Sequence, residues 1–102
     1  MQSLRVTSHT VATAVGRGVA ALAEALQQRQ SGLRPNDFTQ EPLATYIGRV
    51  AGIEDAPLPH AWADWECRNN RLAWLALQCD DFRRSAIRAR ERYGADRVAL
   101  VL

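Results

Sequence analysis

The chain ends in the apolar run Arg97-Val98-Ala99-Leu100-Val101-Leu102, which follows a charged helical pattern and Gly94. A short apolar run rich in β-branched residues is typical of a central strand that is buried on both faces of an α/β sheet. Such strands deliver functional loops at their carboxyl ends, where ligands and catalytic groups gather. Because no loop follows this run, we expect the chain to be the front part of a larger α/β domain.

Directly upstream, residues 82–93 predict a helix that Asp80-Asp81 precedes and Gly94 closes. Its solvated face carries arginines at positions 83, 84, 88, 90 and 92. The buried face of this helix is expected to consist of Phe82, Ala86, Ile87 and Ala89.

A second helix is predicted to open at Arg68-Asn69-Asn70-Arg71, with either asparagine as its cap. An apolar stripe runs along it, and Trp74 and Leu77 widen the stripe, so we expect this helix to be buried within a larger body. The stripe consists of Leu72, Leu75, Ala76 and Cys79. A short helical turn is expected at residues 61–66, where Trp62 and Trp65 share a face and pack in a core or an interface.

The N-terminal half predicts a strand through about Ala12, a helix over residues 19–29 that ends at Ser31-Gly32, and a loop at residues 33–37. The helix face is expected to be Val19, Leu22, Ala23 and Leu26. Residues 45–50 predict a short strand inside an otherwise irregular, proline-containing stretch. The fold class is therefore α/β, with few and mostly parallel strands. The first and last strands lie side by side in this prediction and are joined by a right-handed crossover.

Composition is that of one globular domain, or part of one, over residues 1–102: 47% of the residues are hydrophobic and 24% are charged. A net charge of +2 is too small to indicate a polyanion partner by itself. All 13 basic residues are arginine, which reflects either a coding bias or arginine-specific recognition. No secretory signal and no membrane-length apolar run is present, and two cysteines match no zinc or redox pattern. We expect a cytoplasmic protein with reduced thiols.

Four stretches, in order, resemble the N-terminal part of β-ketoacyl-acyl-carrier-protein synthases, the condensing enzymes of thiolase-like fold. They are VTSHTVATAVGRG (6–18), VAALAEALQQRQSGLRP (19–35), CRNNRLAWLALQ (67–78) and YGADRVALVL (93–102). Gln30-Ser31-Gly32-Leu33 resembles the "G-x-S-G-[LI]" segment of that family, and Asp96–Leu102 resembles the strand that enters its Gly-Thr/Ser loop. The resemblance covers nearly the whole chain.

The resemblance implies a partial thiolase-like half-domain and a decarboxylative Claisen condensation that extends fatty-acid, polyketide or aryl-polyene chains. In this family a cysteine carries the acyl group, a malonyl-carrier protein supplies two carbons, and no metal or redox cofactor is needed. The implied partners are the acyl carrier protein and a second subunit, which is either an identical copy or a chain-length factor. Basic residues at the start of the second helix receive the carrier protein, which marks Arg68 and Arg71 as candidate contacts.

None of the family's catalytic residues falls within this chain, because the cysteine, both histidines and the lysine come later. Cys79 lies on an apolar stripe and Cys67 has no assigned base, so both thiols are expected to be structural. His9 and His60 lack any cluster with metal-ligand spacing and are expected to be ordinary satisfied or exposed histidines. The chain alone is therefore expected to be catalytically inert.

A second hypothesis is a small self-contained α/β binding module whose arginine-rich helix docks an acidic protein. That helix is otherwise an ordinary solvated face, and a nucleic-acid role is disfavoured because no aromatic platform interleaves the arginines. The two hypotheses differ at residues 98–102, which the module would pair in a sheet and the segment would leave as an exposed apolar edge. On either hypothesis, so few strands at this size give marginal independent stability.

Overall fold

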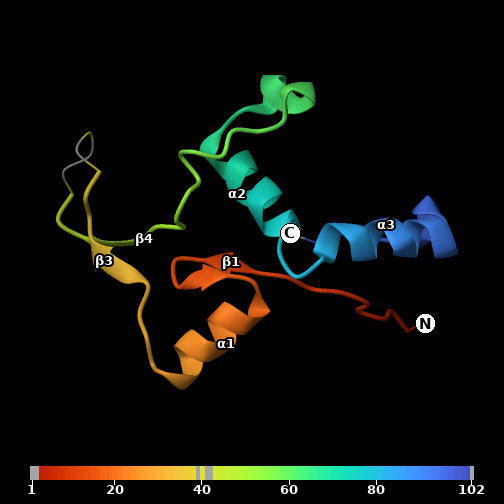
Figure 1. The fold of residues 1–102 in the computed structure, drawn as a ribbon, viewed down its shortest axis with the longest axis horizontal. Helices are drawn as coiled ribbons and strands as arrows, with labels where there is room; N and C mark the ends of the chain where they lie inside the picture. The colour runs from red at the N-terminus through yellow and green to blue at the C-terminus, as the bar shows by residue number, and fades with distance from the viewer. Residues whose placement is uncertain (1–2, 39, 41–42, 102) are drawn as a thin grey trace.

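The computed structural model describes residues 3–38, 40 and 43–101. Within these residues one short antiparallel hairpin lies on either side of the first helix, and two further helices follow in succession, with a 3-10 turn before the first of them and another after the second. In order, the elements are β1 (Ala12–Thr13), β2 (Gly16–Arg17), α1 (Val19–Gln27), β3 (Leu33–Pro35), β4 (Tyr46–Gly48), η1 (His60–Trp65), α2 (Arg68–Leu77), α3 (Phe82–Tyr93) and η2 (Ala95–Arg97). Figure 1 shows the β3–β4 hairpin and α3 extending to opposite sides of a centre formed by the β1–β2 hairpin, α1 and α2.

The mixture of helix and strand was expected, but the strand pairing differs from the prediction. Within the described residues both sheets are two-stranded and antiparallel, not parallel and joined by a crossover. β1 pairs with β2 across a tight turn, with Ala12 opposite Arg17, and β3 pairs with β4, with Arg34 opposite Ile47. Antiparallel pairing of neighbouring segments needs only a local turn, whereas a parallel ladder needs a partner strand brought back by a long crossover.

Three sequence-based strand and loop assignments are corrected. Residues 4–11 carry no regular structure, so the predicted first strand is reduced to its end in β1. Residues 33–35, predicted as part of a loop, form β3 by pairing with β4. Pro35 is compatible with this strand because both strands of a two-stranded sheet are edge strands, where a missing N–H is tolerated. The final strand predicted from Arg97 onward is not formed. Arg97 belongs to η2, and Val98 is extended (φ −123°, ψ 122°), but no described residue pairs with residues 98–101. Leu102 lies outside the described residues.

The start of α1 is held by a carboxylate that is distant in sequence. Gly18 precedes the helix with φ +87° and supplies no side-chain cap. Asp80 Oδ2 instead accepts the backbone N–H of Val19 (3.0 Å) and the Thr10 hydroxyl (2.8 Å). A Cβ on Gly18 would lie 2.9 Å from Asp80 Oδ1, so the close approach of the carboxylate also needs glycine there. The sequence favours Asp80-Asp81 as the cap of the helix over residues 82–93, whereas the Asp80 side chain caps α1.

The end of α1 comes slightly earlier than predicted, at a Schellman motif rather than at Ser31-Gly32. Arg29 adopts the left-handed conformation (φ 54°), its N–H bonds the Leu26 carbonyl at 3.2 Å, and the Gln30 N–H bonds the Ala25 carbonyl at 2.8 Å. The inner face of α1 is also rotated, because Ala25 is buried whereas Leu26 is 69% exposed.

The two later helices confirm the predicted boundaries. α2 begins at Arg68, but its cap is Cys67 rather than an asparagine: the Sγ atom accepts the Asn70 N–H at 3.5 Å. α3 spans Phe82–Tyr93 and ends at Gly94, as predicted. Asp80 and Asp81 both take positive φ angles (52° and 55°), which turns the chain sharply between these helices.

Little apolar surface is buried. Only Ala25, Ile53 and Leu75 among the described apolar residues are buried. Accessible surface is 8595 Å², whereas a folded monomer of this size exposes about 5,800 Å². The radius of gyration is 16.6 Å, against about 13 Å for a compact domain of this length. The body around α2, expected to bury this helix, is therefore open. Trp62 and Trp65, which were expected to pack in a core or an interface, are 53% and 67% exposed. No described helix has both the length and the apolar character needed to cross a membrane.

We expect Asp80→Gly to destabilise α1 more than Asp81→Gly does, by about 1 kcal/mol, because only the first removes a helix cap. Glycine accepts the positive φ at both positions, so the two substitutions change the backbone in the same way. The matched control loses only the exposed Asp81–Arg84 ion pair, and such pairs contribute little. Native-state amide exchange of the first turn of α1 measures the difference, and equal exchange in both variants would contradict the role assigned to Asp80.

Candidate functional site

The candidate contact residues Arg68 and Arg71 lie in the first turn of α2, one helical turn apart, but they have different surroundings. Arg71 is only 24% exposed in its side chain and makes an ion pair with Glu66. Its Nη1 atom also donates to the carbonyls of Ile53 (3.3 Å) and Glu54 (2.7 Å). Arg71 therefore ties α2 to the end of η1 and to the segment before it.

Arg68 is more accessible. Its Nε and Nη2 atoms both lie 3.0 Å from Glu54 Oε1, and the side chains of Arg68 and Glu54 are 48% and 51% exposed. An ion pair at such exposure is weak and exchanges readily with an outside carboxylate. Of the two predicted contacts, Arg68 is thus the one that can reach a partner.

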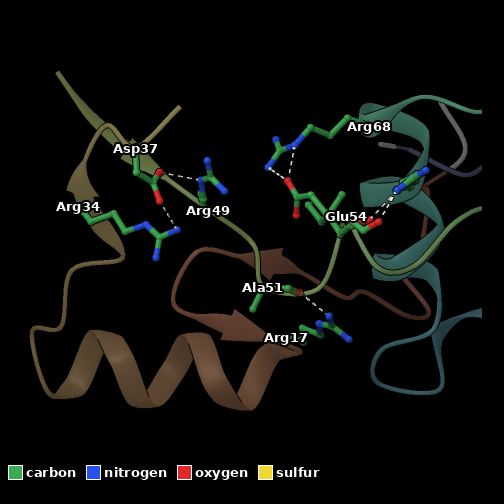
Figure 2. A network of polar contacts seen from close by, with 9 residues as sticks. Arg17, Arg34, Asp37, Arg49, Ala51, Glu54 and Arg68 are labelled. Carbon is green, nitrogen blue, oxygen red and sulfur yellow. Dashed lines mark hydrogen bonds and ion pairs between the residues drawn. The ribbon is translucent and has the colours of Figure 1, made fainter. Parts of the chain in front are cut away.

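Phe38 joins this region to the β3–β4 hairpin. The Arg49 guanidinium lies 4.0 Å from the centre of the Phe38 ring, and the Arg68 guanidinium lies 5.5 Å from it. Both distances are within the range of cation–π attraction. Asp37, next in the chain to Phe38, pairs with Arg49 (2.9 Å) and with Arg34 (3.1 Å), as Figure 2 shows.

A fifth arginine reaches the same region from the β1–β2 hairpin. Arg17 donates to the Ala51 carbonyl, below the Glu54–Arg68 pair in Figure 2. Gly52 follows with φ +76°, and a Cβ there would lie 2.6 Å from the Arg17 guanidinium. Glycine at this position therefore allows both the turn and the approach of the arginine. We call this set the arginine network; its members are Arg17, Arg34, Asp37, Phe38, Arg49, Glu54, Glu66, Arg68 and Arg71.

Hydrogen bonds hold the two glutamates of the network in their charged form. A backbone hydrogen bond, and then the Arg68 guanidinium, lower the pKa of Glu54 from its ordinary value of 4.5. The pKa of Glu66 is lowered from the same value by its hydrogen bond with Arg71 and next by the Leu58 N–H, which lies 2.8 Å from Oε2. A carboxylate that accepts such bonds is favoured over the neutral acid.

The remaining candidates from the sequence lie apart from one another. Cys67 is exposed and caps α2, whereas Cys79 is half-buried and its thiol donates to the Leu75 carbonyl at 3.4 Å. His9 and His60 are both exposed. The described residues contain no group of three or more His, Cys, Asp and Glu side chains that could hold a metal ion.

Sequence reasoning missed most of the arginine network. Phe38, Arg49 and Glu54 lie in the irregular stretch, where periodicity carries no information about contacts. The only available signal was that arginine and acidic residues recur on both sides of Gly52. This pattern indicates compensated charge, but it does not indicate which residues pair.

The site holds fixed positive charge and compensating carboxylates. Its chemistry is that of a polar clamp with accessible guanidinium groups at Arg34 and Arg68, suited to recognising an acidic group. No family model, curated protein or solved structure matches this chain.

We expect the carboxyl groups of Glu54 and Glu66 to titrate below 4.5 in the folded chain and near that value in urea. Because the folded pKa values are lowered, the stabilisation is fully present above pH 4.5 and is lost as the pH falls through the folded values. NMR titration of the side-chain carboxyl carbons measures both states.

Two substitutions separate the two glutamates. Arg71→Gln is expected to raise the pKa of Glu66, and Arg68→Gln that of Glu54, each with little effect on the other glutamate. Folded-state titration at or above the urea values in the unsubstituted chain would contradict the ion pairs described here.

Proposed function

We propose that residues 1–102 form the N-terminal part of a β-ketoacyl-acyl-carrier-protein synthase and support condensation without performing it. The observation that carries this proposal is the open, weakly buried structure. With only Ala25, Ile53 and Leu75 buried among the described apolar residues, the chain lacks the core of an independent domain. An incomplete domain that packs against further chain accounts for this exposure, and the resemblance of the four sequence stretches, in order, supports this family.

Two extended segments support the finer assignment to a thiolase-like half-domain. Leu4 and Val6 are 101% and 81% exposed, and Leu100 and Val101 are 48% and 89% exposed. These apolar side chains lie in segments that pair with no strand within the described residues, as expected of strands whose partners belong to another part of the protein. In the proposal they become parallel central strands when the rest of the sheet is present.

The proposed enzyme is a cytoplasmic acyltransferase that works as a homodimer or with a chain-length partner. Its cysteine carries the growing acyl chain as a thioester, and decarboxylation of a malonyl-carrier protein supplies the two-carbon unit. Residues 1–102 contribute none of the reacting groups in this proposal. Their role is to build the first part of the sheet and to present Arg68 at the start of α2.

The alternative of a self-contained binding module has less support. A module of this length would fold cooperatively and pair its last strand, whereas residues 98–101 are unpaired in the described part of the chain. The accessible surface of 8595 Å² also exceeds the roughly 5,800 Å² of a folded monomer of this size.

The coding sequence beyond Leu102 tests the proposal. We expect a Gly-Thr/Ser-rich loop, then a cysteine among small residues and two later histidines. The encoded full-length protein should condense an acyl group with malonyl-carrier protein, and its cysteine-to-alanine variant should not. Residues 1–102 alone should be inactive and should scatter light on heating.

A stop codon directly after Leu102, together with a clear and reversible melt of the product, would overturn the proposal. Absence of condensation by a full-length protein that carries the expected residues would count against the assigned reaction.

Charge reversal at Arg68 tests the carrier contact in the full-length protein. We expect Arg68→Glu to raise KM for the carrier-bound substrate about tenfold with little change in kcat, because it repels the carrier without touching the reacting atoms. Arg29→Glu makes the same charge change at an exposed position in the turn after α1 and serves as the control. Equal KM values for the two variants would remove Arg68 from the contact.

A further inference from the structure

The outward face of α3 carries an apolar side chain that the sequence pattern assigned to the core. Ile87 is 45% exposed. The half-buried residues of α3 lie along a different stripe, which consists of Phe82, Ser85, Ala86 and Ala89. Because α3 turns 3.6 residues per turn, this stripe directs Ile87 away from the body of the chain.

Arginines surround Ile87 on this outward face. Arg83 and Arg84 lie four and three residues before Ile87 and Arg90 lies three residues after it, so these three side chains project near that of Ile87; Glu91, four residues after Ile87, lies on the same face. α3 as a whole contains five arginines and one acidic residue, Glu91. The helix is therefore strongly basic although the whole chain is only slightly so.

Most of this charge is uncompensated. Within the described residues, the only α3 arginine in an ion pair is Arg84, whose Nε lies 3.0 Å from Asp81 Oδ1. Asp80, the other nearby carboxylate, is already occupied by Thr10 and by the start of α1. The arginines around Ile87 thus differ from those of the arginine network, which are paired with carboxylates or backbone carbonyls.

A hollow lies beside Ile87 at the start of α3. Its volume is about 390 Å³, and it is lined by Leu77, Gln78, Asp81, Arg83, Arg84 and Ile87. Leu77 and Ile87 give it apolar walls, while guanidinium groups line its rim. An apolar anchor with charged groups around it is the usual layout of a protein-binding hot spot.

We propose that this face of α3 docks an acidic amphipathic helix of another protein. An apolar side chain of that helix packs against Leu77 and Ile87. Carboxylates one helical turn to either side of it meet Arg83 and Arg90, and the Asp81 pair holds Arg84 at the rim. Guanidinium groups suit carboxylates because they offer several donors in a fixed plane.

The surface fits a protein better than a nucleic acid. Non-specific nucleic-acid surfaces stack bases on open aromatic rings. The two rings near these arginines already contact guanidinium groups, since Arg83 lies 5.4 Å from the Trp74 ring centre and Arg92 lies 5.3 Å from that of Tyr93. A sugar-phosphate backbone also offers no apolar side chain for the hollow.

This inference goes beyond the proposed function and does not depend on it. The face on α3 is formed by residues outside the arginine network, and no assay of condensation or of Arg68 enters its test.

Fluorescence anisotropy with the full chain and a labelled synthetic peptide tests the proposal. The probe is a helical peptide with a central leucine and glutamates three and four residues to either side. The first comparison is a shuffled peptide of the same composition, and the second is a single-stranded oligonucleotide. We expect the helical peptide to bind more tightly than either, and its affinity to fall as salt is added.

The variants locate the binding. Arg90→Glu should weaken the helical peptide about tenfold, whereas Arg5→Glu, the same charge change away from α3, should not. Ile87→Gln should weaken the helical peptide and leave the shuffled peptide unchanged, because glutamine keeps the helix and removes the apolar anchor. Circular dichroism of each variant verifies that α3 is intact.

Other outcomes would overturn the proposal. Equal binding of the helical and shuffled peptides would mean that charge alone is recognised. Tighter binding of the oligonucleotide through Arg90 would assign the face to nucleic acid, and absence of binding in the folded chain would remove the site.

Discussion

The Asp80 carboxylate is the contact on which the arrangement of the two halves of the chain depends. It binds the Thr10 hydroxyl and the first N–H of α1, groups 70 and 61 residues away in sequence. A helix N-terminus attracts a negative charge, and Gly18 leaves this one without a cap of its own. The carboxylate can lie there because the turn between α2 and α3 holds Asp80 in the left-handed conformation. One short turn therefore places α1 and the β1–β2 hairpin against the start of α3.

Polar contacts do in the middle of the chain what apolar packing does in an ordinary domain. Arg17 and Arg71 approach the segment around the buried Ile53 from two sides, and both bind its backbone carbonyls. Phe38 and Asp37 then hold the β3–β4 hairpin to the same region through Arg49. Such contacts define directions well, but each contributes little free energy when water reaches it. An architecture built this way has a specific shape and a small core.

The helices were predictable from the sequence because their signals are local. α3 was predicted from end to end, since Gly94 and the aspartates at its start mark a continuous pattern. The N-terminal caps were not predictable, because a cap can come from a residue distant in sequence. Cys67 caps α2 in place of the predicted asparagine. Asp80, expected at the start of α3, caps α1. The predictions of the strands were wrong for a related reason, since β3 forms only through its pairing with β4. Ile87 shows the limit of periodicity, which finds an apolar stripe but not the neighbour that covers it.

The absence of lysine gives the surfaces of this protein one common property. Guanidinium groups stay charged at all physiological pH values, so the positive charge of α3 and of Arg68 is constant. The groups with lowered pKa values, Glu54 and Glu66, change charge only below 4.5. Changes of pH in the neutral range therefore leave the Arg68–Glu54 and Arg71–Glu66 ion pairs charged, whereas added salt screens the exposed ion pairs. Binding of a partner through these arginines should consequently weaken as the ionic strength rises. The exposed apolar side chains supply the share of the binding free energy that salt does not screen.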